Sequence, residues 1–138
     1  MGLSWARAAT WIVAFVVGLV YGVAGTIGQA ATWAGLPAGL VVAIIGAGAL
    51  MVAVRLLTED RWTALATGLG AMFATLVFSG KGPGGSVVVP APPDGEISTG
   101  VVWTIAVPIL TAIVVGWPAL RAAPATDAAT HPSPPPTP

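Results

Sequence analysis

Two pairs of polar side chains lie in or beside long apolar stretches, where they could do chemistry. Tyr21 and Gln29 belong to the first stretch and its end, and Thr104 and Thr111 belong to the fourth. Hydroxyl and amide groups hydrogen-bond uncharged solutes, so these four residues are a candidate polar lining. The same groups also hydrogen-bond between neighbouring helices, which needs no ligand. Which interpretation holds depends on how the helices that carry these four residues are arranged.

A second pattern is made of small residues spaced four positions apart, which places them on one face of a helix. Close backbone contact at such residues is what attracts helices to one another in lipid. We therefore predict helix packing at these positions, either within one chain or against a second copy or a larger membrane protein. The residues are Ala14, Gly18 and Gly22 in the first stretch, and Gly35, Gly39 and Ala43 in the second.

Residue sets for catalysis or metal binding are not visible. The chain has no cysteine, and its one histidine, His131, lies in a Pro-rich tail. Ion-coupled transporters keep an ionisable residue inside the membrane, whereas the apolar stretches here contain none. We expect no enzyme, no metal and no cofactor. The formal net charge of zero argues against a nucleic-acid partner.

The composition predicts an all-α integral membrane protein. The chain is 56% hydrophobic and 7% charged, and about 20 apolar residues are enough for a helix to cross a bilayer. Four such spans are predicted, at about 8–27, 36–54, 62–79 and 100–120. We expect them to form an antiparallel bundle over residues 1–121. The short connection at 28–35 makes the first two spans a hairpin, so an arrangement as two helical hairpins is also open. A cleaved signal peptide is the rival interpretation of the first span, although its apolar core is long for one.

The arginines predict the orientation of the spans. Arg7, Arg55, Arg61 and Arg121 fall on one side of the membrane, and the other side carries Lys81. Positive residues concentrate in cytoplasmic segments. We therefore expect a bacterial plasma-membrane protein with both termini in the cytoplasm, an outer loop at 80–99, and a disordered Pro/Ala/Thr-rich cytoplasmic tail at 122–138.

Other residues refine this picture. The six tryptophans fall near the predicted span ends, where indole rings favour the membrane interface, and Trp103 is assigned to the outer one. The third span is the least apolar, with Thr63, Thr67 and Thr75, so we expect it to depend on its neighbours. Thr58 is predicted to cap that helix.

Four spans with tryptophans at their ends, a Pro/Gly-rich outer loop and a Pro-rich tail together resemble small actinobacterial membrane proteins of unknown function. The chain is also similar to the small multidrug resistance family in size and span number, but it lacks that family's membrane-embedded glutamate. Our leading hypothesis is a structural or accessory subunit that acts through helix–helix packing in the lipid bilayer. The alternative is a small oligomeric channel or facilitator for an uncharged or apolar solute.

Overall fold

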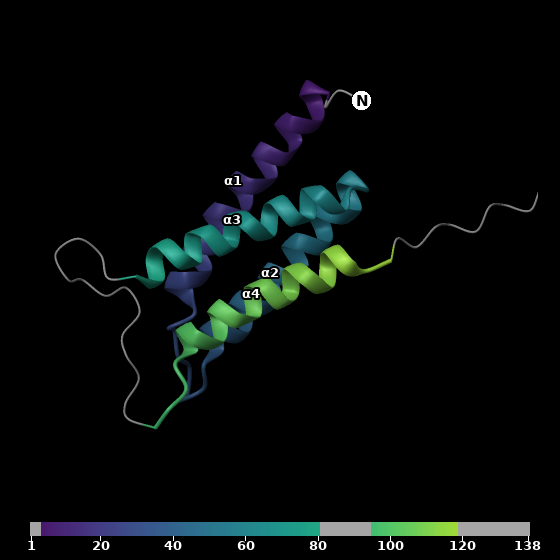
Figure 1. Cartoon of the computed structure of the whole chain (residues 1–138). Coiled ribbons are helices and arrows are strands. Elements are labelled where there is room, and N and C mark those ends of the chain that lie inside the picture. Colours follow the sequence, from purple (N-terminus) through teal and green to yellow (C-terminus); the bar gives the residue numbers. More distant parts are fainter. Residues whose placement is uncertain (1–3, 81–94, 119–138) are drawn as a thin grey trace, which may run out of the picture.

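The computed structural model describes residues 4–80 and 95–118, and these form four packed α-helices (Figure 1). The helices are α1 (Trp5–Gly28), α2 (Ala38–Thr58), α3 (Arg61–Ser79) and α4 (Thr99–Gly116). Each is long and apolar enough to cross a membrane. The predicted all-helical, four-span fold is confirmed. The predicted tail at 122–138 and most of the loop at 80–99 lie outside the described residues.

Prolines explain where the helix boundaries differ from the predicted spans. α4 ends at Gly116 rather than at position 120, because Trp117 precedes Pro118 and is therefore extended. α2 begins only after Pro37 and continues to Thr58. The prediction that Gly35 belongs to a helical stripe was wrong. Gly35 lies in the turn before α2 and has a φ of 78°, which glycine adopts without steric cost.

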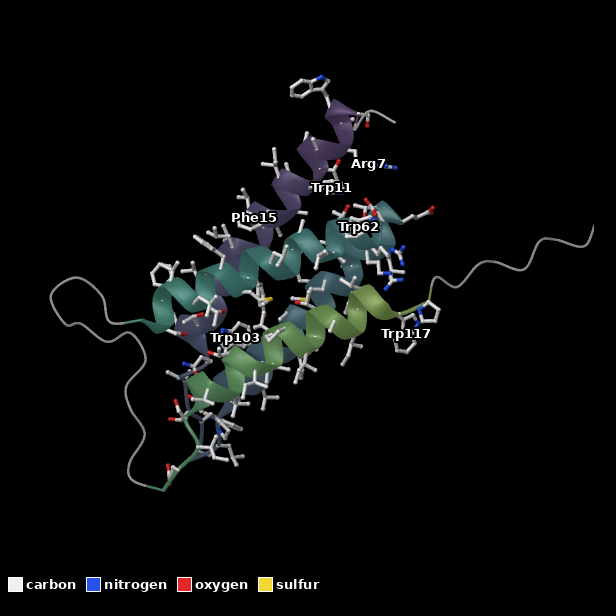
Figure 2. The ribbon with its side chains drawn as sticks, viewed as in Figure 1. Arg7, Trp11, Phe15, Trp62, Trp103 and Trp117 are labelled. Atoms are coloured by element: carbon white, nitrogen blue, oxygen red, sulfur yellow. The ribbon has the colours of Figure 1, made fainter. Side chains whose placement is uncertain are left out.

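Successive helices alternate in direction (Figure 1), so the described arginines, Arg7, Arg55 and Arg61, gather at one end of the bundle. We call this the arginine-bearing end; it contains the start of α1, the short α2–α3 turn and the end of α4. Figure 2 shows Arg7, Trp11, Trp62 and Trp117 toward this end and Trp103 toward the other. The N-terminal part of α1 projects beyond the other helices (Figure 1), and Trp5 is 93% exposed.

The most extensive contact in the bundle joins α1 and α3, which run in the same direction. Trp11 of α1 hydrogen-bonds Asp60, directly before α3, and Thr26 of α1 lies beside Thr75 of α3. The partners are 49 positions apart in both pairs. A constant offset means that the two helices keep one parallel register along their length. This contact, between alternate helices, is larger than that within the predicted α1–α2 hairpin.

Glycines allow this contact to be unusually close. A β-carbon on Gly18 would overlap the carbonyl group of Thr67, and one on Gly22 would lie 2.6 Å from the carbonyl oxygen of Ala71. Gly70 of α3 approaches the α1 backbone equally closely from the other side. Gly18 and Gly22 therefore pack within the chain, where their missing side chains let two backbones touch.

α3 is both the most polar span and the most buried one. Its mean hydropathy is 1.4, against 2.0 or more for the others, and 44% of its membrane window is buried, against 28% or less. α3 contacts all three other helices. Its threonines, Thr63, Thr67 and Thr75, are almost completely buried. The neighbouring helices thus shield from lipid the polar residues that make this span the weakest by composition.

Alanine substitutions at two glycines test the α1–α3 contact. We expect Gly18→Ala to lower the free energy of unfolding by about 1–3 kcal/mol, because the added methyl group meets a backbone carbonyl that cannot move aside. The matched control is Gly48→Ala in α2, whose β-carbon would lie 3.6 Å from the Leu110 side chain. This variant should be neutral or up to about 1 kcal/mol more stable, since alanine favours helix. Unfolding in mixed micelles provides the measurement, and equal effects at both positions would contradict the assigned contact.

Candidate functional site

Trp103 is the centre of the polar interior. It lies near the start of α4 and has an exposed fraction of 0%. Its six-membered ring occupies the space left by Gly25, where a β-carbon would overlap it. Trp103 lies toward the end of the bundle to which the sequence assigned it, opposite the arginines (Figure 2), but its ring turns into the bundle and not toward the membrane interface. The glycine opposite it makes room for the ring inside the bundle.

Trp103 joins three helices through one N–H group. Its Nε1 atom lies 3.1 Å from the Oγ1 atoms of both Thr26 in α1 and Thr75 in α3. Each threonine donates its own proton to a carbonyl of its helix, at Gly22 over 2.7 Å and at Ala71 over 2.8 Å. Both hydroxyl oxygens are therefore left as acceptors, and the indole N–H lies between them. All these groups are satisfied within the chain.

Thr75 was noted from the sequence only because it makes the third span less apolar, and neither threonine of this cluster was predicted to bond Trp103. Thr26 continues the four-residue spacing that runs through Gly18 and Gly22, so its place on the contact face was readable. The sequence does not show that Thr75 is its partner, because nothing in it indicates the parallel register that brings the two threonines together. The tryptophan in α4 was likewise assigned by its distance from the end of a span alone.

Tyr21 connects α1 to α2. Its hydroxyl group donates to the carbonyl oxygen of Ala43 over 3.1 Å. A β-carbon on Gly46 would overlap that hydroxyl, so Gly46 provides the space for the tyrosine. Gly39 is likewise in close contact with the carbonyl of Gly28. Tyr21, Gly39 and Ala43 therefore all belong to the α1–α2 contact.

An open groove runs beside this α1–α2 contact. Its volume is about 330 Å³, and its lining is largely apolar. The α1 wall contains Ala24 and Gly28, and the α2 wall contains Ala38, Gly39 and Val42. Val42 is 69% exposed, so the groove opens toward the surface that faces lipid. Small residues on both walls would let another helix come close.

Gln29 lies at the C-terminal end of α1 and is buried, with 1% of its surface exposed. Neither its Oε1 nor its Nε2 atom has a hydrogen-bond partner among the described residues. It follows Gly25 by one helical turn and so shares the α1 face that meets Trp103. A buried amide without partners is unfavourable.

Thr104 and Thr111 lie at different contacts of α4. Each donates to a carbonyl oxygen of its own helix over 2.8 Å, Thr104 to Gly100 and Thr111 to Val107. The side chain of Thr111 also fills the space beside Gly68 of α3. A cavity of about 40 Å³ beside Thr104 has room for about one or two water molecules.

The four predicted lining residues therefore do not share one cavity within the chain. Tyr21 alone of the four lines the α1–α2 groove, and Thr104 alone lines the small α3–α4 cavity. Among the described residues, no three His, Cys, Asp or Glu side chains come together in a way that could hold a metal ion. The arrangement binds helices to one another, and it leaves the groove as the site open to a partner.

Asp60 closes the other end of the α1–α3 contact. Its Oδ1 atom accepts the backbone N–H of Trp62 over 2.9 Å, which caps α3. Its Oδ2 atom accepts the indole N–H of Trp11 over 3.0 Å and the hydroxyl of Thr63 over 3.3 Å. The prediction that Thr58 caps α3 was wrong, because the Thr58 hydroxyl donates back to its own helix.

The surroundings of Asp60 favour its charged form. Partial burial alone raises the pKa of this carboxyl, but the hydrogen bonds from Trp11, Trp62 and Thr63 and the charge of Arg7 outweigh that effect. The pKa of Asp60 consequently lies below its ordinary value. A carboxylate that accepts hydrogen bonds at a helix start is stabilised by the same N–H groups that it satisfies.

A double-mutant cycle tests the Trp103 cluster. We expect Trp103→Phe and Thr26→Val to be coupled by about 1 kcal/mol, because each removes one side of the same interhelical hydrogen bond. The control cycle combines Trp103→Phe with Thr63→Val, at a buried threonine that bonds Asp60. That pair should be additive. Unfolding free energies in bicelles give both values, and a coupling no larger than in the control would contradict the shared bond.

Acid titration tests Asp60. Because its folded-state pKa is depressed, its contribution to stability is present above the unfolded pKa of about 3.9 and is lost as pH falls through the folded value. Below about pH 4, the melting temperature of the wild-type protein should therefore fall more steeply than that of Asp60→Asn, because asparagine keeps an acceptor but has no charge. Asp60→Ala, which removes the cap, should cost about 1 kcal/mol at neutral pH. An unchanged acid profile in Asp60→Asn would contradict the assignment.

Comparison with known proteins gives no family for this chain. No protein-family model, no curated protein and no solved structure matches it. What is established is a set of four packed helices, each able to cross a membrane, which is compatible with a multi-pass membrane protein.

Proposed function

We propose that this chain is a structural or accessory subunit of a membrane assembly and that it acts through helix–helix packing. The observation that carries the proposal is the open groove between α1 and α2, with small residues on both walls. In lipid, helices associate where small residues allow their backbones to approach. The groove offers such a surface, whereas Gly18 and Gly22 are already used inside the chain.

The filled interior supports packing over solute passage. Buried threonines donate their protons to carbonyl oxygens of their own helices. The cavity beside Thr104 holds only about 40 Å³. Within the described part of the chain, a solute would have to displace these helix contacts in order to pass. A role at the surface needs no such rearrangement.

The occupant we assign to the groove is a transmembrane helix of a larger membrane protein. The groove lies between the C-terminal part of α1 and the first turns of α2 and is open to the outside of the bundle, so a spanning helix could lie against it. Ala24 and Gly28 leave room on the α1 wall, and a β-carbon on Gly28 would meet nothing within 4 Å. Val42 supplies apolar surface on the opposite wall.

The arginines support the membrane and the orientation that we assign. Arg7, Arg55 and Arg61 all belong to the arginine-bearing end of the bundle. By the positive-inside rule this end faces the cytoplasm of a bacterial plasma membrane, and both termini are cytoplasmic. The actinobacterial source suggested by the resemblance is part of the same proposal.

Filling the groove tests the proposal. Ala24→Phe should reduce recovery of a membrane partner about tenfold or more, because a phenyl ring on the α1 wall blocks close approach of a helix. The control is Ala112→Phe, at an exposed alanine of α4 that lies outside the groove. The measurement is mild-detergent purification from the native host through a C-terminal tag, with quantitative mass spectrometry.

Photocrosslinking from the same wall identifies the occupant. A photoreactive residue at position 24 should crosslink to a partner protein, and one at position 112 should not. Crosslinks from position 24 to lipid alone, or equal recovery from both phenylalanine variants, would contradict the docking role. Crosslinks to a second copy of the chain would show that the groove is an interface of a homo-oligomer. They would contradict the larger membrane protein that we assign as the occupant.

A further inference from the structure

Arg55 occupies the gap between the ends of α2 and α4. It lies in the last turn of α2, and its Nη2 atom donates to the backbone carbonyl of Trp117, directly after α4. The guanidinium group thereby ties together two helix ends that both present carbonyl groups. These carbonyls are dipoles without net charge, so they orient the cation but do not neutralise it.

One nitrogen of this guanidinium has no acceptor. The Nη1 atom is buried and has no hydrogen-bond partner among the described residues. A guanidinium has five N–H donors in a fixed plane, and a charged donor removed from water without an acceptor is strongly unfavourable. Arg55 as a whole is only half-buried and its bond to Trp117 is exposed, so an anionic acceptor can approach the guanidinium from outside the helices.

The carboxylates nearby are already occupied or exposed. Both oxygens of Asp60 accept hydrogen bonds from Trp11, Trp62 and Thr63, and the charge of Arg7 acts on the same carboxylate. Glu59 is exposed, in the turn between α2 and α3. The charges of Arg7 and Asp60 cancel. Two positive charges, on Arg55 and Arg61, then remain against one negative charge, on Glu59. This end of the described bundle thus carries an excess of positive charge.

The position of Arg55 indicates the kind of anion. It stands at the end of a membrane-length helix, at the depth where lipid headgroups lie. Trp117 beside it is 58% exposed and Trp62 is 53% exposed, and indole rings favour this interface. The guanidinium of Arg61 lies 5.8 Å from the centre of the Trp62 ring. Basic pockets between helices at this depth bind anionic headgroups, and a phosphate matches the planar fork of arginine.

We propose that Arg55, held by the Trp117 carbonyl between the ends of α2 and α4, binds the phosphate of an anionic membrane phospholipid. The phosphate accepts from the half-exposed guanidinium, whose Nη1 lacks a partner among the described residues, and the lipid chains lie along the apolar faces of the two helices. This site is at the arginine-bearing end and does not include the α1–α2 groove. The proposal therefore does not depend on the function proposed above.

Lipid binding to the purified full-length protein tests this site. Phosphatidylglycerol and phosphatidylcholine are titrated in the same detergent, and bound lipid is counted by native mass spectrometry. Wild-type protein should bind phosphatidylglycerol about tenfold more tightly than phosphatidylcholine, as expected for one charge-assisted hydrogen-bonded contact. Arg55→Gln should abolish this preference. Arg55→Lys, which keeps the charge but loses the fork, should retain only part of it.

The control is Arg61→Gln, which removes a charge from the same end and should keep most of the preference. An equal loss of the lipid preference in Arg55→Gln and Arg61→Gln would mean that the preference depends on net charge and not on Arg55. That result would overturn the site. A wild-type protein that does not distinguish the two lipids would also overturn it. Inorganic phosphate that displaces phosphatidylglycerol at the same concentration would assign the site to a soluble anion instead. If Arg55→Gln does not fold, a full preference in Arg55→Lys would equally contradict the proposal.

Discussion

The close approach of the α1 and α3 backbones is the constraint on which the rest of the structure depends. Lipid gives helices no hydrophobic reason to associate, so attraction comes from contact distance and from polar groups that find partners. Gly18 and Gly22 remove the side chains that would keep α1 away from α3. Once the backbones touch, α3 becomes the most buried of the four helices, and a span that is only moderately apolar becomes the centre of the bundle.

Polar residues fix both ends of this contact and attach the other helices to it. Trp103 bridges Thr26 and Thr75 at one end, and Asp60 receives Trp11 at the other. Tyr21 then ties α2 to α1 through the Ala43 carbonyl. Each of these bonds is made between groups of the same chain. The interior thus holds the helices together, and the buried polar groups that lack partners among the described residues, Gln29 and one nitrogen of Arg55, lie toward its ends.

The two proposed interactions use different surfaces and different forces. The groove between α1 and α2 would act through shape, because small residues admit another helix. Arg55 would act through charge, because a phosphate would complete a guanidinium that the described residues leave partly unpaired. A bulky residue at position 24 and a neutral residue at position 55 therefore perturb one without the other. A subunit of this kind would be held in the membrane by lipid at one end and would meet its partner along one side.

The sequence by itself determined that four apolar helices alternate in direction and where most of them begin and end, because span length and proline position are local properties. It also placed Gly18, Gly22 and Gly39 on faces that pack. It could not determine which helices meet, since small residues mark any close contact and four spans can pair in several ways. Only the tertiary structure decided that α1 and α3 run in parallel register, that Trp103 turns inward, and that Asp60 rather than Thr58 caps α3. Those outcomes depend on which partner is within hydrogen-bonding reach, and that distance exists only once the helices are packed.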